Sequence, residues 1–274
     1  MANELSAPLR GVDFTCAPTR RKPITVARGQ RLGQVLRLDG VAAHESLASF
    51  EAQLAEPGPW LGAFDFPFGL PREFVESMQL GQDIDAVIAA VHGRCVNRMA
   101  FRRWIDEWGN ARPAGQRLIH RRTDRAMAGI SSTSPLQTRY VPVGFMFYEG
   151  LHRLVAAGVH IPGMRVGNTQ HTALEGYPGL LAFELIGRRS YKNDPSADRL
   201  IARKDMLAAL EQGRTRLALR LKLSPAQHER LVEDASGDSL DAVLCLMQAA
   251  WASGQPGHGL PADIDPLEGW IVSA

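Results

Sequence analysis

The chain has 274 residues, 45% of them hydrophobic and 22% charged, which is the composition of an ordinary globular protein with one large or two small domains. Its net charge of +2 identifies no class of partner, because positive and negative residues are mixed. Cys16, Cys95 and Cys245 lie far apart without CxxC spacing, so they support neither a disulfide framework nor a zinc site and favour a reduced, cytoplasmic setting. The N-terminus has no signal-peptide pattern, and the apolar run over 243–252 falls far short of the roughly 20 residues that span a bilayer, so we expect no membrane partner.

The first quarter of the chain predicts strands interrupted by one helix. Residues 9–15 are typical of a short buried strand that ends in Asp13. Residues 24–40 alternate apolar and other side chains around Gly33, which predicts two strands of a hairpin or meander. Residues 45–55 carry a helical pattern, and the apolar run over 60–65 predicts another strand, ending in Asp65.

From about 71 to 165 the chain becomes arginine-rich and mainly helical. Helices are expected over 72–78, 83–108 and 143–158, and residues 109–142 are expected to form mostly loop. Strand character returns at 171–178, followed by helix patterns over 178–187, 197–213, 224–235 and 237–252, and a short closing strand over 268–272. The pattern predicts a mixed α/β sheet with a helical insertion before the last strand.

Acidic residues recur within apolar stretches of the chain. Asp13 lies in LRGVDFT, Asp65 in WLGAFDFPFGLP and Glu175 in HTALEGYP, while Asp238 and Asp241 lie three apart in GDSLDAVLCLMQAAWA. An ionised carboxylate in an apolar setting is costly unless it is hydrogen-bonded, paired with a cation or bound to a metal. If these acids converge, a divalent metal is the simplest common partner, which predicts a metal-dependent phosphoryl-transfer enzyme.

The predicted elements give these acids a plausible meeting point. Asp13 and Asp65 end their strands, at the sheet edge that carries the binding crevice in open α/β proteins. Asp238 and Asp241 would share one face of an apolar helix that must pack on the sheet. Taken singly, each acid could instead be a turn or cap residue, and Asp238 fits the N-cap of its helix.

Five segments together resemble a known family. They are GVDFTCAP, AFDFPFGLP, EGYPGLLAFELIGRRSYK, GDSLDAVLCLMQAAW and EGWIV, in an order that runs from residue 11 to about 272. The family is an uncharacterised bacterial and archaeal one, domain of unknown function 429 (DUF429), described as predicted nucleases of the ribonuclease H-like superfamily. The resemblance implies a single ribonuclease H-like domain over 1–274, with a five-stranded mixed sheet, its second strand antiparallel, flanking helices, and the insertion at about 71–165.

The resemblance also implies a site. Asp13 matches the acid of the first strand, Asp65 matches the acid of a later strand beside it, and Asp238 and Asp241 are similar to the Asp-x-x-Asp pair on the last helix of Holliday-junction resolvases. Glu175 is the remaining candidate. We therefore expect Asp13, Asp65, Glu175 and Asp241 to be catalytic and to bind Mg²⁺ or Mn²⁺, with Asp238 as a further ligand or a supporting acid.

Basic residues provide candidates for substrate binding. The helix expected over 83–108 carries Arg94, Arg98 and Arg102 at i, i+4 and i+8, a stripe that could neutralise phosphates of a nucleic acid. A solvated face paired with acids is an equal alternative. Lys192 follows the EGYP motif and could reach a substrate phosphate, or lie on the surface.

We expect a metal-dependent nuclease that hydrolyses phosphodiesters of DNA or RNA. Two alternatives stay open: a non-catalytic nucleic-acid- or protein-binding module on the same fold, with the arginines as its binding surface, and a small-molecule phosphoryl-transfer enzyme. The protein partners and the identity of the nucleic acid do not follow from the sequence.

Overall fold

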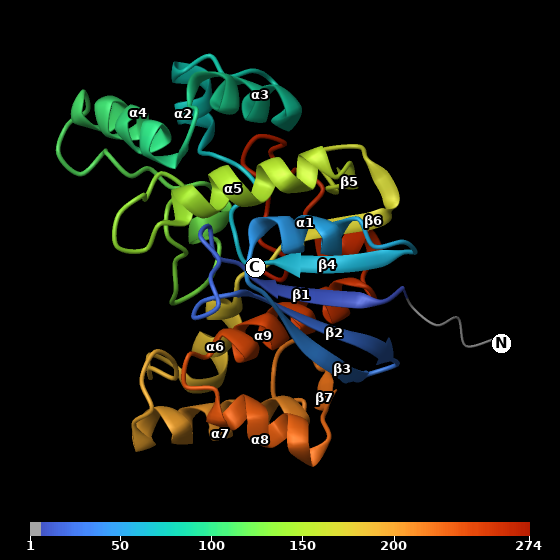
Figure 1. Ribbon diagram of the computed structural model, residues 1–274. Helices are drawn as coiled ribbons and strands as arrows, with labels where there is room; N and C mark the ends of the chain where they lie inside the picture. Colours follow the sequence, from blue (N-terminus) through green and yellow to red (C-terminus); the bar gives the residue numbers. More distant parts are fainter. Residues whose placement is uncertain (1–6) are drawn as a thin grey trace.

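A computed structural model describes residues 7–274 and shows an α/β protein built on a seven-stranded mixed sheet (Figure 1). The strands are β1 (Leu9–Asp13), β2 (Ile24–Leu32), β3 (Val35–His44), β4 (Trp60–Phe64), β5 (Val159–His160), β6 (Asn168–Glu175) and β7 (Arg220–Lys222). Their order across the sheet is β5-β6-β4-β1-β2-β3-β7. β2 is antiparallel to both of its neighbours, and the other pairings are parallel. The mixed sheet flanked by helices confirms the predicted α/β class, with β5 and β7 as edge strands that the sequence did not predict.

Helices cover the sheet on both faces. On one face lie α1 (Leu47–Leu54), α2 (Arg72–Ser77), α3 (Ile84–Arg94), α4 (Arg98–Asn110) and α5 (Val143–Ala156). On the other face lie α6 (Pro178–Ile186), α7 (Ala197–Glu211), α8 (Pro225–Glu233) and α9 (Asp238–Ala252). Two short helices, η1 (Thr123–Arg125) and η2 (Pro256–Gly259), lie in connections. Each face has its own hydrophobic core, because strand side chains alternate between the two sides: Val12 and Phe64 face the first group of helices, and Leu9 and Ala63 face the second. Among residues 7–274, no helix combines the length and the apolar character needed to cross a membrane.

Helix α9 lies directly against the centre of the sheet at Gly11. A Cβ atom built on Gly11 would lie 2.1 Å from both the carbonyl oxygen of Ala242 and the backbone nitrogen of Leu246, so a larger residue at this position would push the helix away. The first turn of α9 is thereby held beside the C-terminal end of β1. The helix begins after Gly237, the N-cap, in the left-handed conformation at φ 79°. Asp238 is therefore the first residue of the helix and not its cap.

The register of β1 and β4 places two acids side by side. These strands are parallel, with Gly11 opposite Ala63. Asp13 and Asp65 each lie two residues further along, on the same face as Gly11 and Ala63, because side chains alternate with a period of two. The backbone N–H of Asp65 donates to the carbonyl of Val12 at 2.9 Å, which continues the pairing to the end of the strands.

The register of β6 directs Glu175 to the opposite face. Glu175 is paired with Phe64, so its side chain lies on the same face of the sheet as that of Phe64 and on the opposite face from that of Asp65. Gly176 occupies the position that faces α9: a Cβ atom there would lie 3.2 Å from the Sγ of Cys245 and 3.3 Å from the Cβ of Ala63. The site on the α9 side therefore receives a glycine from β6 where the sequence pattern had suggested a carboxylate.

The single helix predicted over 83–108 is wrong, because two helices occupy this range. Helix α3 ends at Arg94, and Cys95 adopts an extended conformation. Helix α4 starts after Asn97, whose side chain accepts a hydrogen bond from the backbone N–H of Ala100 as an N-cap. The expected closing strand over 268–272 is reduced to one parallel bridge between Ile271 and Glu175.

Candidate carboxylate site

Three carboxylates from separate elements, one fully buried and two half-buried, meet at the C-terminal ends of β1 and β4. Asp13 ends β1, Asp65 follows β4, and Asp241 lies in the first turn of α9 with no exposed surface. Burial raises the pKa of Asp13 well above its ordinary value, and the neighbouring charges of Asp241 and Asp65 raise it further. Burial, followed by Asp241, raises the pKa of Asp65 to about 7. Asp241 therefore raises the cost of ionising both Asp13 and Asp65, as expected of like charges in one site.

Asp241 has two hydrogen-bond donors, one for each carboxylate oxygen. The hydroxyl of Tyr191 donates to Oδ1, and the Nζ of Lys192 donates to Oδ2. Lys192 is the cation of the cluster, since its charge also lowers the pKa of both Asp13 and Asp65. Burial acts to lower the pKa of Lys192, but Asp241 and the other two acids outweigh it and raise that pKa above its usual value.

Unlike Asp241, Asp13 and Asp65 accept no hydrogen bond at their side-chain oxygens from any donor within residues 7–274. Asp13 lies beside Asp238, which is half-buried at the rim of the site. Burial raises the pKa of Asp238, and the charge of Lys22 opposes this increase. The two acids of α9 therefore have different places: Asp241 lies inside the cluster, and Asp238 lies at its edge towards Lys22.

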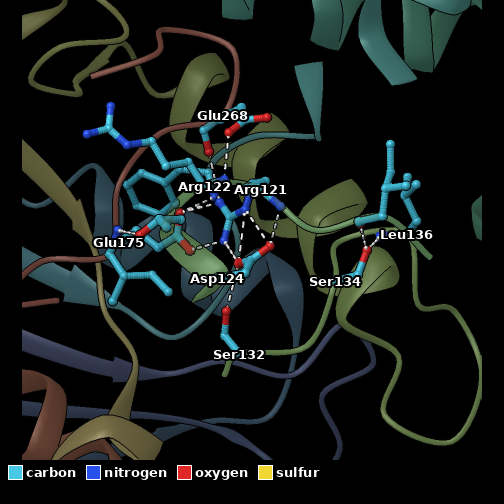
Figure 2. A network of polar contacts seen from close by, with 12 residues as sticks. Arg121, Arg122, Asp124, Ser132, Ser134, Leu136, Glu175 and Glu268 are labelled. Carbon is cyan, nitrogen blue, oxygen red and sulfur yellow. Dashed lines mark hydrogen bonds and ion pairs between the residues drawn. The ribbon is translucent and has the colours of Figure 1, made fainter. Parts of the chain in front are cut away.

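Glu175, directed by the register of β6 to the other face of the sheet, belongs to a buried ion-pair network (Figure 2). Arg121 donates from Nη2 to its Oε1 at 2.6 Å and from Nη1 to its Oε2 at 2.7 Å, and the backbone N–H of Phe68 donates at 2.9 Å. The same guanidinium binds Asp124, which also accepts a hydrogen bond from Ser132. Burial raises the pKa of Glu175, and Arg121 opposes this increase. The carboxylate of Glu175 is thus already satisfied by the protein.

The segment that carries Tyr191 and Lys192 is held in place from α7. Arg203 has 1% of its surface exposed and donates to the carbonyls of Tyr191 and Val232, each at 2.7 Å. Arg199 donates to the carbonyl of Lys192. Neither arginine was among the predicted site residues, because one isolated arginine in a helix pattern gives no sign that it binds a distant backbone. Tyr191 was also missed, although it directly precedes Lys192.

The predicted arginine stripe is divided between two helices and is engaged within the protein. Arg94 belongs to α3 and lies over the ring of Trp104, with its guanidinium carbon 4.7 Å from the ring centroid. Arg98 belongs to α4, where it pairs with Glu149 at 3.2 Å. Arg102 donates to the carbonyl of Thr138, with its guanidinium over the ring of Phe145. These contacts fasten α4 to its surroundings, and of the three arginines only Arg94 is exposed.

The donor chemistry of the cluster fits a hard divalent cation. Asp13, Asp65 and Asp241 offer oxygen ligands of the kind that Mg²⁺ and Mn²⁺ prefer, and the first two carboxylates are half-buried, which leaves them open to an ion. With the side chains in their present positions, no group of three His, Cys, Asp or Glu residues within residues 7–274 is arranged to hold an ion. Lys192 occupies Oδ2 of Asp241, so binding an ion would require this ammonium group to move. Asp13, Asp65 and Asp241 are the residues that would hold the ion.

Comparisons of the chain with protein-family models, with curated proteins and with solved structures found no match.

Proposed function

We propose that the protein is a Mg²⁺- or Mn²⁺-dependent phosphodiesterase that hydrolyses nucleic acid at the carboxylate site. The observation that carries the proposal is the meeting of Asp13, Asp65 and Asp241 at one end of the sheet, where the charge of Asp241 raises the pKa of the other two acids. Oxygen ligands of this kind are the ones that Mg²⁺ and Mn²⁺ prefer, and such ions stabilise the charge that develops in displacement at phosphorus.

The topology supports a ribonuclease H-like core as part of this proposal. The inner strands follow the order β3-β2-β1-β4-β6, and the second strand of the chain, β2, is antiparallel to its neighbours, as the resemblance implies for that strand. The first strand, the neighbouring parallel strand and the last long helix each contribute one acid to the cluster. We exclude Glu175 from the proposed ligand set, because Arg121 and Phe68 already bind both of its oxygens.

The surroundings of the site favour a polyanionic substrate. Arg20, Arg21 and Lys22 are consecutive exposed cations in the connection that leaves β1 at Asp13, and within residues 7–274 none of the three forms an ion pair. Unpaired cations next to a metal site can neutralise phosphates on either side of the one that reacts. Lys192 lies at the same edge and would place its ammonium group beside the reacting phosphate once an ion had taken its place at Asp241.

The test is hydrolysis of a panel of single-stranded, duplex, hybrid and branched nucleic acids in the presence of Mn²⁺. We expect Asp13→Asn and Asp241→Asn to lower the rate at least about 100-fold, because each removes a charged oxygen ligand. Asp39→Asn is the matched control, since Asp39 is exposed on β3 and remote from the cluster. Equal activity in Asp13→Asn and Asp39→Asn, or no hydrolysis of any substrate, would count against the proposal.

A further inference from the structure

A cavity of about 530 Å³ adjoins the carboxylate site and is distinct from it. Asp65, Tyr177 and Lys192 lie at the end that the cavity shares with the site. Its volume falls within the range of roughly 300–1,000 Å³ that is typical of small-molecule sites. The cavity therefore has room for part of a substrate whose reacting phosphate lies at the acids.

The walls of the cavity come from segments that the buried network holds together. Arg121, Ser132 and Glu175 all line it, and these residues belong to the network in Figure 2. The network joins the connection after α4 to the end of β6, and Arg121 also donates to the carbonyl of Glu268 at 2.9 Å. The wall is therefore built from buried, charge-paired residues, which gives the cavity a fixed shape.

One part of the cavity is apolar and aromatic. Phe183 lies on α6, Ile130 and Val143 lie on the facing segment, and Val141 has 57% of its surface exposed at the same cavity. The guanidinium of Arg188 lies 5.7 Å from the ring centroid of Phe183. A flat ring placed here would stack on Phe183 and gain contact with an arginine plane, which are the two surfaces on which nucleobases stack in proteins.

Two polar groups of the cavity are available to a ligand, because the protein engages them weakly or not at all. Within residues 7–274 Arg188 forms no ion pair, and its one hydrogen bond is a long one of 3.5 Å to the carbonyl of Gly129. The hydroxyl of Tyr177 has no hydrogen-bond partner in the same part of the chain. Burial, followed by the charge of Asp65, raises the pKa of Tyr177 to about 12, so this hydroxyl remains a donor. A cation and a hydroxyl donor beside the apolar, aromatic part of the cavity favour an anionic ligand with an aromatic ring.

We propose that this cavity binds one nucleotide unit, with its phosphate at the Lys192 end and its base against Phe183 beneath Arg188. The proposal rests on the proposed function, because the phosphate is assigned to the end at which hydrolysis would occur. The same chemistry is offered by a free nucleoside monophosphate and by the terminal unit of a nucleic acid chain.

The test is equilibrium binding of AMP, adenosine and inorganic phosphate by calorimetry, with the full-length protein in Ca²⁺ and separately in EDTA. We expect AMP to bind at least about tenfold more tightly than adenosine or inorganic phosphate. Phe183→Leu should weaken AMP binding about 5- to 100-fold, in line with the loss of one base stack, and Arg188→Gln should also weaken it. Arg103→Gln, which removes an exposed arginine on α4 far from the cavity, is the charge-matched control and should not.

The outcomes separate this inference from the proposed function. AMP that binds no better than phosphate, or a Phe183→Leu protein that behaves like Arg103→Gln, overturns the nucleotide assignment even if polynucleotides are hydrolysed. Tight AMP binding without any hydrolysis would leave the assignment intact and overturn the nuclease. Short oligonucleotides with free and blocked ends identify where the bound nucleotide unit comes from. An affinity higher than that of AMP that requires a free end supports the terminal unit of a chain. An affinity no higher than that of AMP supports a free nucleotide.

Discussion

At the scale of single residues, the defining contact of the site is the ion pair between Lys192 and Asp241. It places an ammonium group on an oxygen that an ion would need, so the lysine and a divalent cation compete for the same carboxylate. The two partners differ in burial: Asp241 is fully buried, whereas 40% of the lysine side chain is exposed. An exposed side chain can leave its partner at a lower cost than a buried one, since water solvates the freed charge.

Replacing Lys192 should therefore strengthen metal binding while it removes the cation proposed for the phosphate. We expect Lys192→Met to bind Mn²⁺ about tenfold more tightly than the unmodified protein, a gain of roughly 1.4 kcal/mol. The measurement is a Mn²⁺ titration by calorimetry at pH 8.5, above the pKa of about 7 of Asp65 in the unmodified protein. Lys204→Met, an exposed lysine on α7, should bind Mn²⁺ as before. Weaker binding in Lys192→Met would mean that the lysine supports the site and does not compete for it.

At the scale of elements, the buried network of Arg121 joins η1, β6 and the C-terminal segment. Removing one member of a buried ion pair leaves an uncompensated charge, which costs more than the pair itself contributes. We expect Arg121→Met to lower the free energy of unfolding by about 3–5 kcal/mol. Arg122→Met is a stringent control: this neighbouring arginine pairs with Asp263 on the surface, and its loss should cost about 0–1 kcal/mol. Denaturant titration measures both.

The same network yields a test of the role of Glu175. Glu175→Gln should destabilise the protein yet change Mn²⁺ affinity less than about fivefold, because only a screened charge interaction of about 1 kcal/mol with the site is lost. Asp65→Asn should abolish measurable Mn²⁺ binding in the same titration. A comparable loss in both variants would show that Glu175 belongs to the metal site, in conflict with its bonds to Arg121.

The sequence predicted the elements of the site better than their relation to one another. Asp13, Asp65 and Asp241 were found because each follows or begins an apolar run, which is a local signal. The position of Glu175 depends on the register between β6 and β4, where a shift of one residue changes the face of the sheet, and a single chain carries no local sign of it. The break between α3 and α4 did have a local signal, since Asn97 is a good N-cap residue, but continuous helical periodicity on both sides concealed it. Strands of two or three residues, such as β5 and β7, are too short for any pattern.

At the scale of the whole molecule, the acids of the site lie where the two central strands meet the helix that covers them. Their ionisation therefore affects the stability of the entire fold. Burial raises the pKa of Asp65 from an ordinary value of 3.8 to about 7. Below about pH 4 this residue is protonated in both the folded and the unfolded chain. As the pH rises from about 4 to about 7, the unfolded chain loses the proton first, so the folded state is progressively destabilised, and above that range the penalty is constant.

Asp65→Asn isolates this contribution. Groups that do not interact with Asp65 titrate over the same range, such as His92, where burial followed by the charge of His152 lowers the pKa to about 4, but they contribute equally in both proteins and cancel in the difference. The stability gained by Asp65→Asn over the unmodified protein, measured by urea titration in EDTA, should grow by roughly 4 kcal/mol between pH 4 and pH 8.

Divalent metal should narrow the difference in stability between the unmodified protein and Asp65→Asn at pH 8. An ion that binds only the folded state stabilises it by about 2.7 kcal/mol at a concentration 100 times its Kd. Saturating Mn²⁺ should therefore raise the Tm of the unmodified protein and of Asp39→Asn, and leave Asp65→Asn unchanged. At pH 5 the stabilisation by Mn²⁺ should be smaller, because protons then compete for Asp65. A Tm that responds to Mn²⁺ equally in Asp65→Asn and Asp39→Asn would place the ion elsewhere on the molecule. A stability difference that does not change with pH would show that Asp65 is solvated in the folded chain, which would remove the electrostatic reason for a cation at this end of the sheet.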